Sequence, residues 1–278
     1  MTTNLFFGTL KDEKSAVALK HFALKKQIVY NIYKDGPLSN LAISEFTKIS
    51  LPTVTRLLED LFQSNILRQE GVGKSFGGRR PILYGIEPNA AYTLGIDISL
   101  SYFTIGIINM KGQFAGEVVN VELPIENSLS YLEKVYEESQ KVIKQSGVPA
   151  EKIIGVGNSV PGLLNPANGR TLSLFTFSNK PVRALLAAKF GIPVFLDNDA
   201  RLAVLGEHYF GDIREKKNVI CLNVGEGIGL GLSIVKKIAN LHNANIAVDS
   251  NDQSTTFTVK FQGGDCPYLE ISHRGQTP

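Results

Sequence analysis

The sequence contains no tryptophan, two methionines and two cysteines, and these scarcities exclude several classes of protein. Cys221 and Cys266 lie far apart and near no histidine cluster, which argues against a disulfide framework and a cysteine-rich zinc site. No apolar run approaches the roughly 20 residues that span a bilayer. The N-terminus also lacks the basic and apolar segments of a secretion signal. We therefore expect a cytoplasmic protein with no membrane partner, no metal site and no cofactor.

Positive charge is concentrated at the N-terminal end. Residues 1–86 contain 12 lysines and arginines against 7 acidic residues, whereas the rest of the chain contains 17 against 19. The chain of 278 residues is long enough for two domains, and its hydrophobic content of 43% is that of an ordinary globular protein. The positive charge of the N-terminal region would attract the phosphate backbone of DNA.

Three helices are predicted in this basic region. Residues 15–34 have apolar side chains at helical spacing, and Asp35-Gly36-Pro37 ends that helix. Ser39 can cap a second, short helix that runs to about Ile49. A third helix begins with Ser50 as its N-cap and Pro52 in its first turn. The predicted apolar stripe of this third helix consists of Val54, Leu57, Leu58, Leu61, Phe62 and Ile66.

The opposite face of the third helix changes character along its length. Its N-terminal half is neutral or basic, and its C-terminal half carries Glu59, Asp60 and Gln63. A recognition helix enters the major groove of DNA by its N-terminal residues, so this polarity suits DNA binding. The residues predicted to contact DNA from this helix are Ser50, Pro52, Thr53, Thr55 and Arg56.

Residues 67–84 predict a β-hairpin whose return strand starts in a glycine-rich, doubly basic stretch. Lys74 lies in its turn, and Arg79 and Arg80 can insert into a narrow minor groove, where the negative potential is strongest. Three helices followed by a hairpin predict a winged helix-turn-helix over residues 1–86, which binds double-stranded DNA as a homodimer. The alternative is a dimerisation module in which Arg79 and Arg80 are solvated charges.

Strands alternate with helices from Tyr92 onward, which predicts an α/β layer fold with ligand loops at the strand ends. The predicted strands include Ile153–Gly157, followed by a loop from Asn158 to Gly162, and Val219–Asn223, followed by the glycine run Gly225–Gly231. Asp197-Asn198-Asp199 precedes a helix that runs to Phe210.

Five motifs in this region resemble the ROK family, which unites bacterial sugar kinases with sugar-responsive repressors. They are GGRRP (77–81), LGID (94–97), GVGNSVPGLLNPANG (155–169), FGIPVFLDNDARLAVLGE (190–207) and VICLNVGEGIGLG (219–231). The resemblance covers roughly residues 15–231, and the basic N-terminal unit joined by GGRRP looks like the repressor branch. It implies an actin/hexokinase-like α/β domain over residues 87–231.

The resemblance also implies a sugar site. In the family an Asn-Asp pair, here Asn198 and Asp199, holds the sugar hydroxyls, and the Pro-Gly loop, here with Gly162, lies against the same ligand. The expected ligand is a sugar or sugar phosphate. The alternative interpretation of Asp197-Asn198-Asp199 is plain helix capping.

The sequence departs from the kinase branch where ATP would bind. Kinases of the family carry a Gly-Gly-Thr turn after Gly-Ile-Asp, and this chain has Ile98-Ser99-Leu100-Ser101 instead. We therefore expect a repressor of carbohydrate genes that is not an enzyme. One alternative is a sugar kinase with Asp199 as its catalytic base. Another is a protein that binds DNA without sensing a sugar, because the family's later cysteine-rich segment is absent and the domain is expected to be truncated near Gly231.

Residues 225–261 resemble the C-terminal end of a sensor histidine kinase ATPase domain. The glycine box GEGIGLGLS (225–233) would be followed by a helix and two strands, so the predicted tail spans residues 232–262 and residues 263–278 are expected to be loose. The overlap of two glycine motifs is what a recombined, frameshifted or misassembled gene would show. Because the upstream Asn-bearing helix and Asp-containing loop of that kinase are absent, a signalling ATPase is the weakest of the hypotheses.

Overall fold

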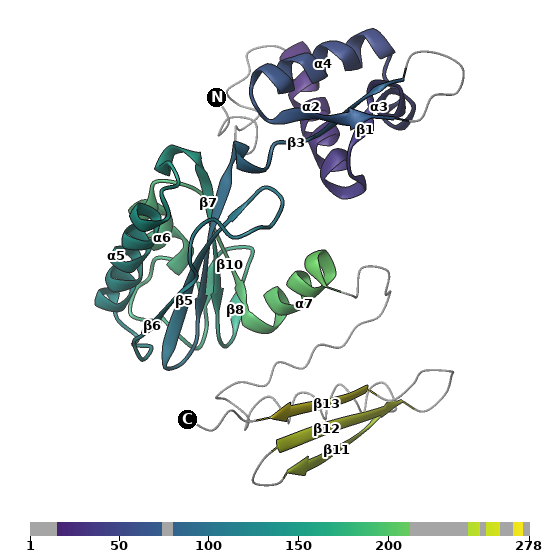
Figure 1. Cartoon of the computed structure of the whole chain (residues 1–278). Helices are drawn as coiled ribbons and strands as arrows, with labels where there is room; N and C mark the ends of the chain where they lie inside the picture. The colour runs from purple at the N-terminus through teal and green to yellow at the C-terminus, as the bar shows by residue number, and fades with distance from the viewer. Residues whose placement is uncertain (1–15, 74–79, 212–243, 251–253, 262–268, 275–278) are drawn as a thin grey trace. The chain divides into compact units, whose positions relative to one another are not determined.

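The computed structural model describes residues 16–73, 80–211, 244–250, 254–261 and 269–274 (Figure 1). Backbone contacts divide the chain into two compact units, Met1–Gly211 and Asp212–Pro278. The first unit carries every predicted site residue. Two of them, Lys74 and Arg79, lie outside the described residues, as do the predicted strand Val219–Asn223 and the glycine run Gly225–Gly231.

The N-terminal part of the first unit contains three helices and a small antiparallel sheet, close to the positions that the sequence predicts. Strand β3 lies between β1 and β2 and is antiparallel to both. The second helix begins as expected, because the Ala42 N–H donates to the Ser39 Oγ at 3.2 Å. The elements are α2 (Ala16–Asp35), β1 (Leu38–Ser39), α3 (Asn40–Thr47), α4 (Leu51–Gln63), β2 (Leu67–Val72) and β3 (Ile82–Ile86).

The core of this part is built on the apolar stripe of α4. Val54, Leu57, Leu58 and Leu61 are each at most 1% exposed, and they pack with buried residues of α2, α3 and the sheet. Phe62 was predicted on the same stripe, and that prediction is wrong, because its side chain is 39% exposed. Successive helical residues lie about 100° apart, which puts Phe62 at the edge of a stripe centred on its neighbour Leu61.

A five-stranded sheet follows in the order β10-β7-β4-β5-β6. Strand β7 is parallel to β4 and β10, and β5 is antiparallel to β4 and β6. The strands are β4 (Tyr92–Ile98), β5 (Tyr102–Asn109), β6 (Val119–Glu122), β7 (Ile153–Val160) and β10 (Val194–Asn198), with a separate pair β8 (Leu164–Asn165) and β9 (Arg170–Thr171). The helices are α5 (Leu129–Ser146), α6 (Val182–Phe190) and α7 (Asp199–Phe210), with short turns η1 (Pro88–Ala90) and η2 (Ala150–Lys152).

Helices α5 and α6 pack their apolar sides on this sheet, where Tyr131, Val135 and Leu186 join the buried strand residues. By contrast, no residue of α7 is buried. The sequence predicts a loop at Asn158, Ser159 and Val160, and that prediction is wrong. These three residues continue β7. They do so because β7 has a strand on each side, with Asn158 paired to Ile96 and Leu196.

The described residues of the second unit form an antiparallel sheet in the order β11-β12-β13 (Figure 1). Its strands are β11 (Ala244–Ser250), β12 (Ser254–Phe261) and β13 (Leu269–Arg274). The expectation of a loose end over residues 263–278 is wrong for residues 269–274, which form β13, and the other residues of that range lie outside the described residues. Leu-Glu-Ile-Ser alternates apolar and polar residues, which is the pattern of a strand, and Leu269 pairs with Val259 of β12.

Candidate functional site

The start of α4 presents polar and apolar groups at the surface. Ser50, Pro52 and Arg56 are exposed, Leu51 is 40% exposed, and Thr53 is partly buried. Ser50 has the extended backbone of an N-cap, but its side chain caps no backbone N–H. Its Oγ lies instead 2.9 Å from the Thr53 Oγ1. Three of the predicted contact residues are therefore exposed near the start of α4, and Ser50 does not cap the helix with its side chain as expected.

The other residues predicted to contact DNA differ in their placement. Thr55 is partly buried, and its Oγ1 donates to the Leu51 carbonyl oxygen at 2.9 Å, so its hydroxyl is used within its own helix. Arg80 is exposed, just before β3. Arg56 has a partner that sequence reasoning missed: its Nη2 lies 3.0 Å from Nε2 of His21 on α2. No sequence signal identifies this pair, because its members are 35 positions apart.

The three residues predicted to bind sugar, Asn198, Asp199 and Gly162, lie together at the junction of β10 and α7. The Asn198 Nδ2 donates to the Gly162 carbonyl oxygen at 2.9 Å. Asp199 follows as the first residue of α7, and its Oδ1 accepts from the Ala200 N–H at 2.8 Å. Asn198 and Asp199 are both partly buried, so a ligand can reach them.

Asn198 is also the N-cap of α7. Its Oδ1 accepts from the Ala200 and Arg201 N–H groups at 3.0 and 3.3 Å, which satisfies two amides at the helix start. The neighbouring Asp197 forms an ion pair with Arg201 at 2.8 Å. Helix capping therefore accounts for the Asn198 side-chain oxygen. The side-chain NH2 group of Asn198 has a second role, because it joins the helix start to the Pro-Gly loop.

The Pro-Gly loop depends on a glycine at position 162. Gly162 has a φ of +86°, which side chains rarely adopt, and an added Cβ would collide with the Ser173 Oγ. That oxygen accepts a hydrogen bond from the Leu163 N–H at 3.0 Å. A side chain at position 162 would therefore disturb the turn that places its carbonyl beside Asn198.

The turn between β4 and β5 is short and closed by backbone bonds. The Ser99 N–H donates to the Tyr102 carbonyl at 2.9 Å, and the Ile125 N–H donates to the Leu100 carbonyl at 2.7 Å. Within the described residues, positive φ values at non-glycine positions occur at Lys48, Asn65 and Phe175, and so not in this turn. The Leu100 side chain is 44% exposed at the tip.

One polar group near the predicted sugar site was missed because the sequence placed it in a loop. Asn158 on β7 is 1% exposed, and neither atom of its side-chain amide has a hydrogen-bond partner within the described part of the chain. The hydroxyl of Tyr131 is similarly buried and unpartnered there. Burial raises the pKa of Tyr131 to about 12.

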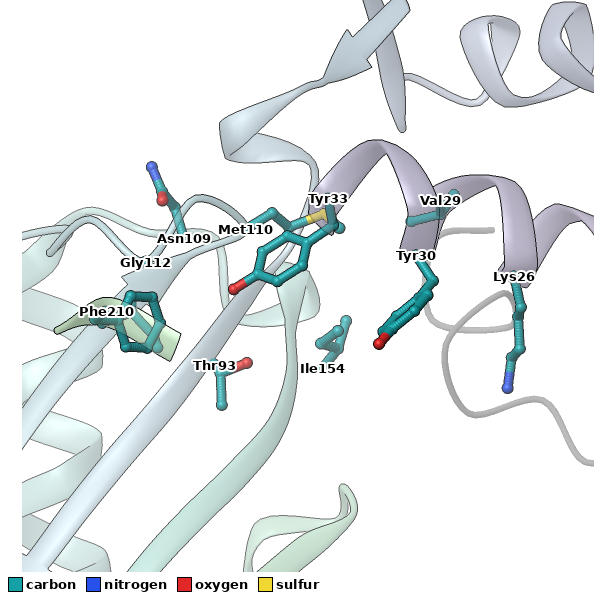
Figure 2. Close-up of a pocket in the computed structure, with 11 residues that line it drawn as sticks. Lys26, Val29, Tyr30, Tyr33, Thr93, Asn109, Met110, Gly112, Ile154 and Phe210 are labelled. Carbon is teal, nitrogen blue, oxygen red and sulfur yellow. The ribbon is translucent and has the colours of Figure 1, made fainter. Parts of the chain in front are cut away.

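A cavity of about 440 Å³ lies between α2 and the five-stranded sheet (Figure 2). Tyr30 and Tyr33 project into it from α2, and Phe210, the last residue of α7, lines it from the other side. The Phe210 ring occupies the place that a Cβ on Gly112 would take. The remaining lining residues are Lys26, Val29, Thr93, Ile108, Asn109, Met110, Gly112 and Ile154.

An ion pair connects the hairpin to the sheet beside this cavity. Lys111, in the turn after β5, lies 3.0 Å from the Glu70 carboxylate on β2. The hydrogen bond from Lys111 lowers the pKa of the Glu70 carboxyl. The helical part and the sheet are thus joined by specific contacts as well as by the connecting chain.

Among the residues that the structure describes, no group of three histidine, cysteine or acidic side chains is arranged to hold a metal ion. None of the described helices has the length and hydropathy needed to cross a membrane.

Known repressors are similar to most of this chain. The xylose repressor of Caldicellulosiruptor bescii is 30% identical over 217 residues, which are 77% of this chain and 54% of that protein. The xylose repressor of Bacillus spizizenii is 26% identical over 253 residues, 87% of this chain and 62% of that protein. The N-acetylglucosamine repressor of Escherichia coli O6:H1 is 23% identical over 80% of this chain and 55% of its own length. The chain therefore spans a little over half the length of these relatives.

A solved structure supports the fold. The crystal structure of a ROK family transcriptional regulator, described as a homologue of the E. coli MLC protein, aligns with a TM-score of 0.55 at 15% identity. The alignment covers 87% of this chain and 56% of that one. The ROK family profile matches residues 93–243, more than half of the chain and past Gly231. The chain belongs to the ROK family.

Proposed function

We propose that this chain is a sugar-responsive transcriptional repressor that binds DNA through a winged helix-turn-helix. The observation that carries the proposal is the start of α4, where Ser50, Thr53 and Arg56 offer hydrogen-bonding groups beside a buried apolar stripe. A recognition helix needs this combination, because it must be held rigidly on one side and offer hydrogen-bonding groups on the other. The repressors to which the chain is similar support the same function.

The sugar site that we propose comprises Asn198, Asp199 and Gly162. The Asn198 amide fixes the start of α7 against the Gly162 carbonyl, so the Asp199 carboxylate is held in place by backbone structure. A carboxylate and an amide together can accept from and donate to neighbouring sugar hydroxyls. Relatives named for xylose and N-acetylglucosamine suggest these sugars, and their phosphates, as the first ligands to test.

Helix α7 offers a physical route from this site to the DNA-binding part. It begins at Asp199 and ends at Phe210, whose ring lines the same cavity as Tyr30 and Tyr33 of α2. Because α7 has no buried residue, small movements of the helix disturb few core contacts. We propose that a sugar bound at the start of α7 shifts Phe210 and thereby changes how α2 supports α4.

The proposed function does not include catalysis. Phosphoryl transfer needs backbone N–H groups brought against the ATP phosphates, usually by a glycine-rich turn. In this structure the Ser99 N–H is bonded to Tyr102 across the turn, and Leu100 stands at its tip. We propose that the turn does not bind phosphate. A homodimer reading two half-sites belongs to the same proposal, since DNA-binding units of this type commonly read paired sites.

The proposal is tested with the full chain and DNA duplexes that it selects from a randomised library. Affinity should fall steeply with salt, because phosphate contacts release counterions. Calorimetry with xylose, N-acetylglucosamine and their phosphates should then find a sugar that weakens binding to the selected duplex. Asp199→Asn should abolish the sugar response and leave DNA affinity unchanged. Asp197→Asn is the matched control, because it removes a neighbouring charge that is paired with Arg201.

Other outcomes separate the alternatives. ATP-dependent phosphorylation of a sugar that is lost in Asp199→Asn would support the kinase hypothesis. Selective DNA binding without a response to any tested sugar would mean that the chain binds DNA without sensing. A sugar response that survives in Phe210→Ala would contradict the route through α7 while leaving the repressor proposal intact.

A further inference from the structure

Arg56, at the start of α4, is held by a side chain from a different helix. Its Nη2 lies 3.0 Å from Nε2 and 3.4 Å from Nδ1 of His21 on α2. A guanidinium has only donors, so the imidazole nitrogen that it contacts must be unprotonated and accept the hydrogen bond. Neutral His21 is therefore the form that fits this geometry.

His21 also borders the surface that we propose contacts DNA. A hollow of about 650 Å³ lies between α2 and the beginning of α4, and His21, Lys48, Ser50 and Thr53 are among the residues that line it. Two of these, Ser50 and Thr53, belong to the predicted DNA-contact set. The imidazole thus stands beside the first turn of α4 and next to the arginine that follows it.

We propose that His21 is a positioning residue that sets the base preference of Arg56. An exposed arginine samples many rotamers, and each ordered side chain loses conformational entropy when it binds. A hydrogen bond to His21 before binding restricts those rotamers and points the guanidinium along one direction. This inference rests on the proposed function, because it presumes that α4 enters a groove of DNA.

The hydrogen bond between Arg56 and His21 requires a neutral imidazole, and other positive charges lie nearby. Among the described residues, Arg56 contacts His21, and Lys48 at the end of α3 and Lys20 on α2 line the same hollow. One turn along α2, Lys25 is paired with Asp60 at 3.0 Å, so that carboxylate is already engaged. Protonation would remove the acceptor from Arg56 and add a like charge beside it. Non-specific attraction to phosphates would grow while the preference set by Arg56 declined.

The test uses the full chain, its selected duplex, single base-pair variants of that duplex and a scrambled duplex. Arg56→Ala should lose preference at one base pair by about tenfold, the usual scale of one bidentate contact. His21→Ala should lose preference at that same pair, and the double variant should be no worse than Arg56→Ala alone. His21→Gln, which keeps a carbonyl acceptor, should retain the preference. His21→Lys should lose it while binding the scrambled duplex more tightly.

Rescue by His21→Gln provides a readout that a merely structural role would not move, because the glutamine side chain restores an acceptor for Arg56 and little else of the imidazole. Equal weakening on every duplex by His21→Ala, additive with Arg56→Ala, would overturn the positioning role. Failure of the parent chain to bind any duplex would instead overturn the proposed function, which distinguishes the two.

Discussion

Helices α4 and α7 both begin at a residue that the sequence identifies as an N-cap, and the structure uses the two residues differently. Asn198 bonds two backbone N–H groups of α7 and the Gly162 carbonyl. Ser50 caps no N–H of α4, and its hydroxyl meets the Thr53 hydroxyl. The Asn198 side chain at the start of α7 bonds the protein backbone, whereas the Ser50 and Thr53 side chains at the start of α4 bond each other.

This difference matches what the two proposed ligands require. A sugar must find its partners already placed, since a misplaced polar group in a partly buried site costs binding energy. A DNA backbone approaches an outer surface, where side chains can adjust to it. The comparison predicts that substitutions at the α7 junction change stability, and that those at the α4 start change DNA binding with little effect on stability.

The largest effect is expected from Gly162→Ala, which should destabilise the fold by about 2–3 kcal/mol because strain from a left-handed backbone adds to displacement of Ser173. Gly191→Ala is the matched control, since Gly191 has a φ of +69° and open space at its Cβ position. The control should cost only about 1 kcal/mol, from backbone strain alone. Urea unfolding measures both. Equal losses would mean that Ser173 adapts freely.

Asn198→Ala should cost about 1–2 kcal/mol, because it removes the cap of α7 and the donor to Gly162 together. Asn198→Asp separates the two contributions: the carboxylate still accepts from Ala200 and Arg201 but cannot donate to the Gly162 carbonyl. We expect the Asp variant to recover about half of the loss. Urea unfolding again provides the measurement, and an Asp variant as unstable as the Ala variant would show that the link to Gly162 matters more than the cap.

Tyr131→Phe tests the core beside the five-stranded sheet, where the Tyr131 hydroxyl has no hydrogen-bond partner among the described residues. Removing the hydroxyl should stabilise the fold by about 1 kcal/mol at neutral pH, because no described residue bonds it. Burial raises the pKa of Tyr131 to about 12 from 10.0, so the folded state keeps the phenolic proton longer than the unfolded state, and the free energy of unfolding falls as pH rises from 10 toward 12. The parent chain should therefore lose more stability than the Phe variant over that alkaline range. Parallel pH profiles would show that burial does not raise the pKa of this hydroxyl in the folded chain.

Sequence patterns predict the helices and most of the strands because each has a local cause. The α4 stripe follows helical spacing, and Ser39 caps α3 through an N–H three residues later. The end of β7 could not be predicted locally, since Asn158 is held in the strand by two partners distant in sequence, Ile96 and Leu196. Strand β13 likewise depends on pairing with β12.

The candidate sites show the same division. The resemblance to the family pointed to Asn198, Asp199 and Gly162, and the structure joins Asn198 to Gly162 over 36 positions. It could not point to His21, because the contact with Arg56 arises from the packing of α2 on α4. It also could not show that Phe210 reaches the cavity beside Tyr33, which depends on the direction in which α7 leaves the sheet.

The smallest effect on stability is expected from Ser50→Ala, and it is the most direct test of the comparison. The Ser50 side chain accepts from no backbone N–H, so its removal should change the free energy of unfolding by less than about 0.5 kcal/mol. Ser39→Ala is the matched control within the same helical part: the Ser39 Oγ accepts from Ala42, and its loss should cost about 1 kcal/mol. DNA affinity should reverse this order, because Ser50 lies beside Thr53 on the exposed start of α4, whereas Ser39 lies at the start of α3. Urea unfolding and fluorescence anisotropy with the selected duplex, run on both variants, measure the two quantities. If Ser50→Ala destabilised the fold as much as Ser39→Ala and left DNA affinity intact, the start of α4 would be an ordinary capped helix and the contrast with α7 would fail.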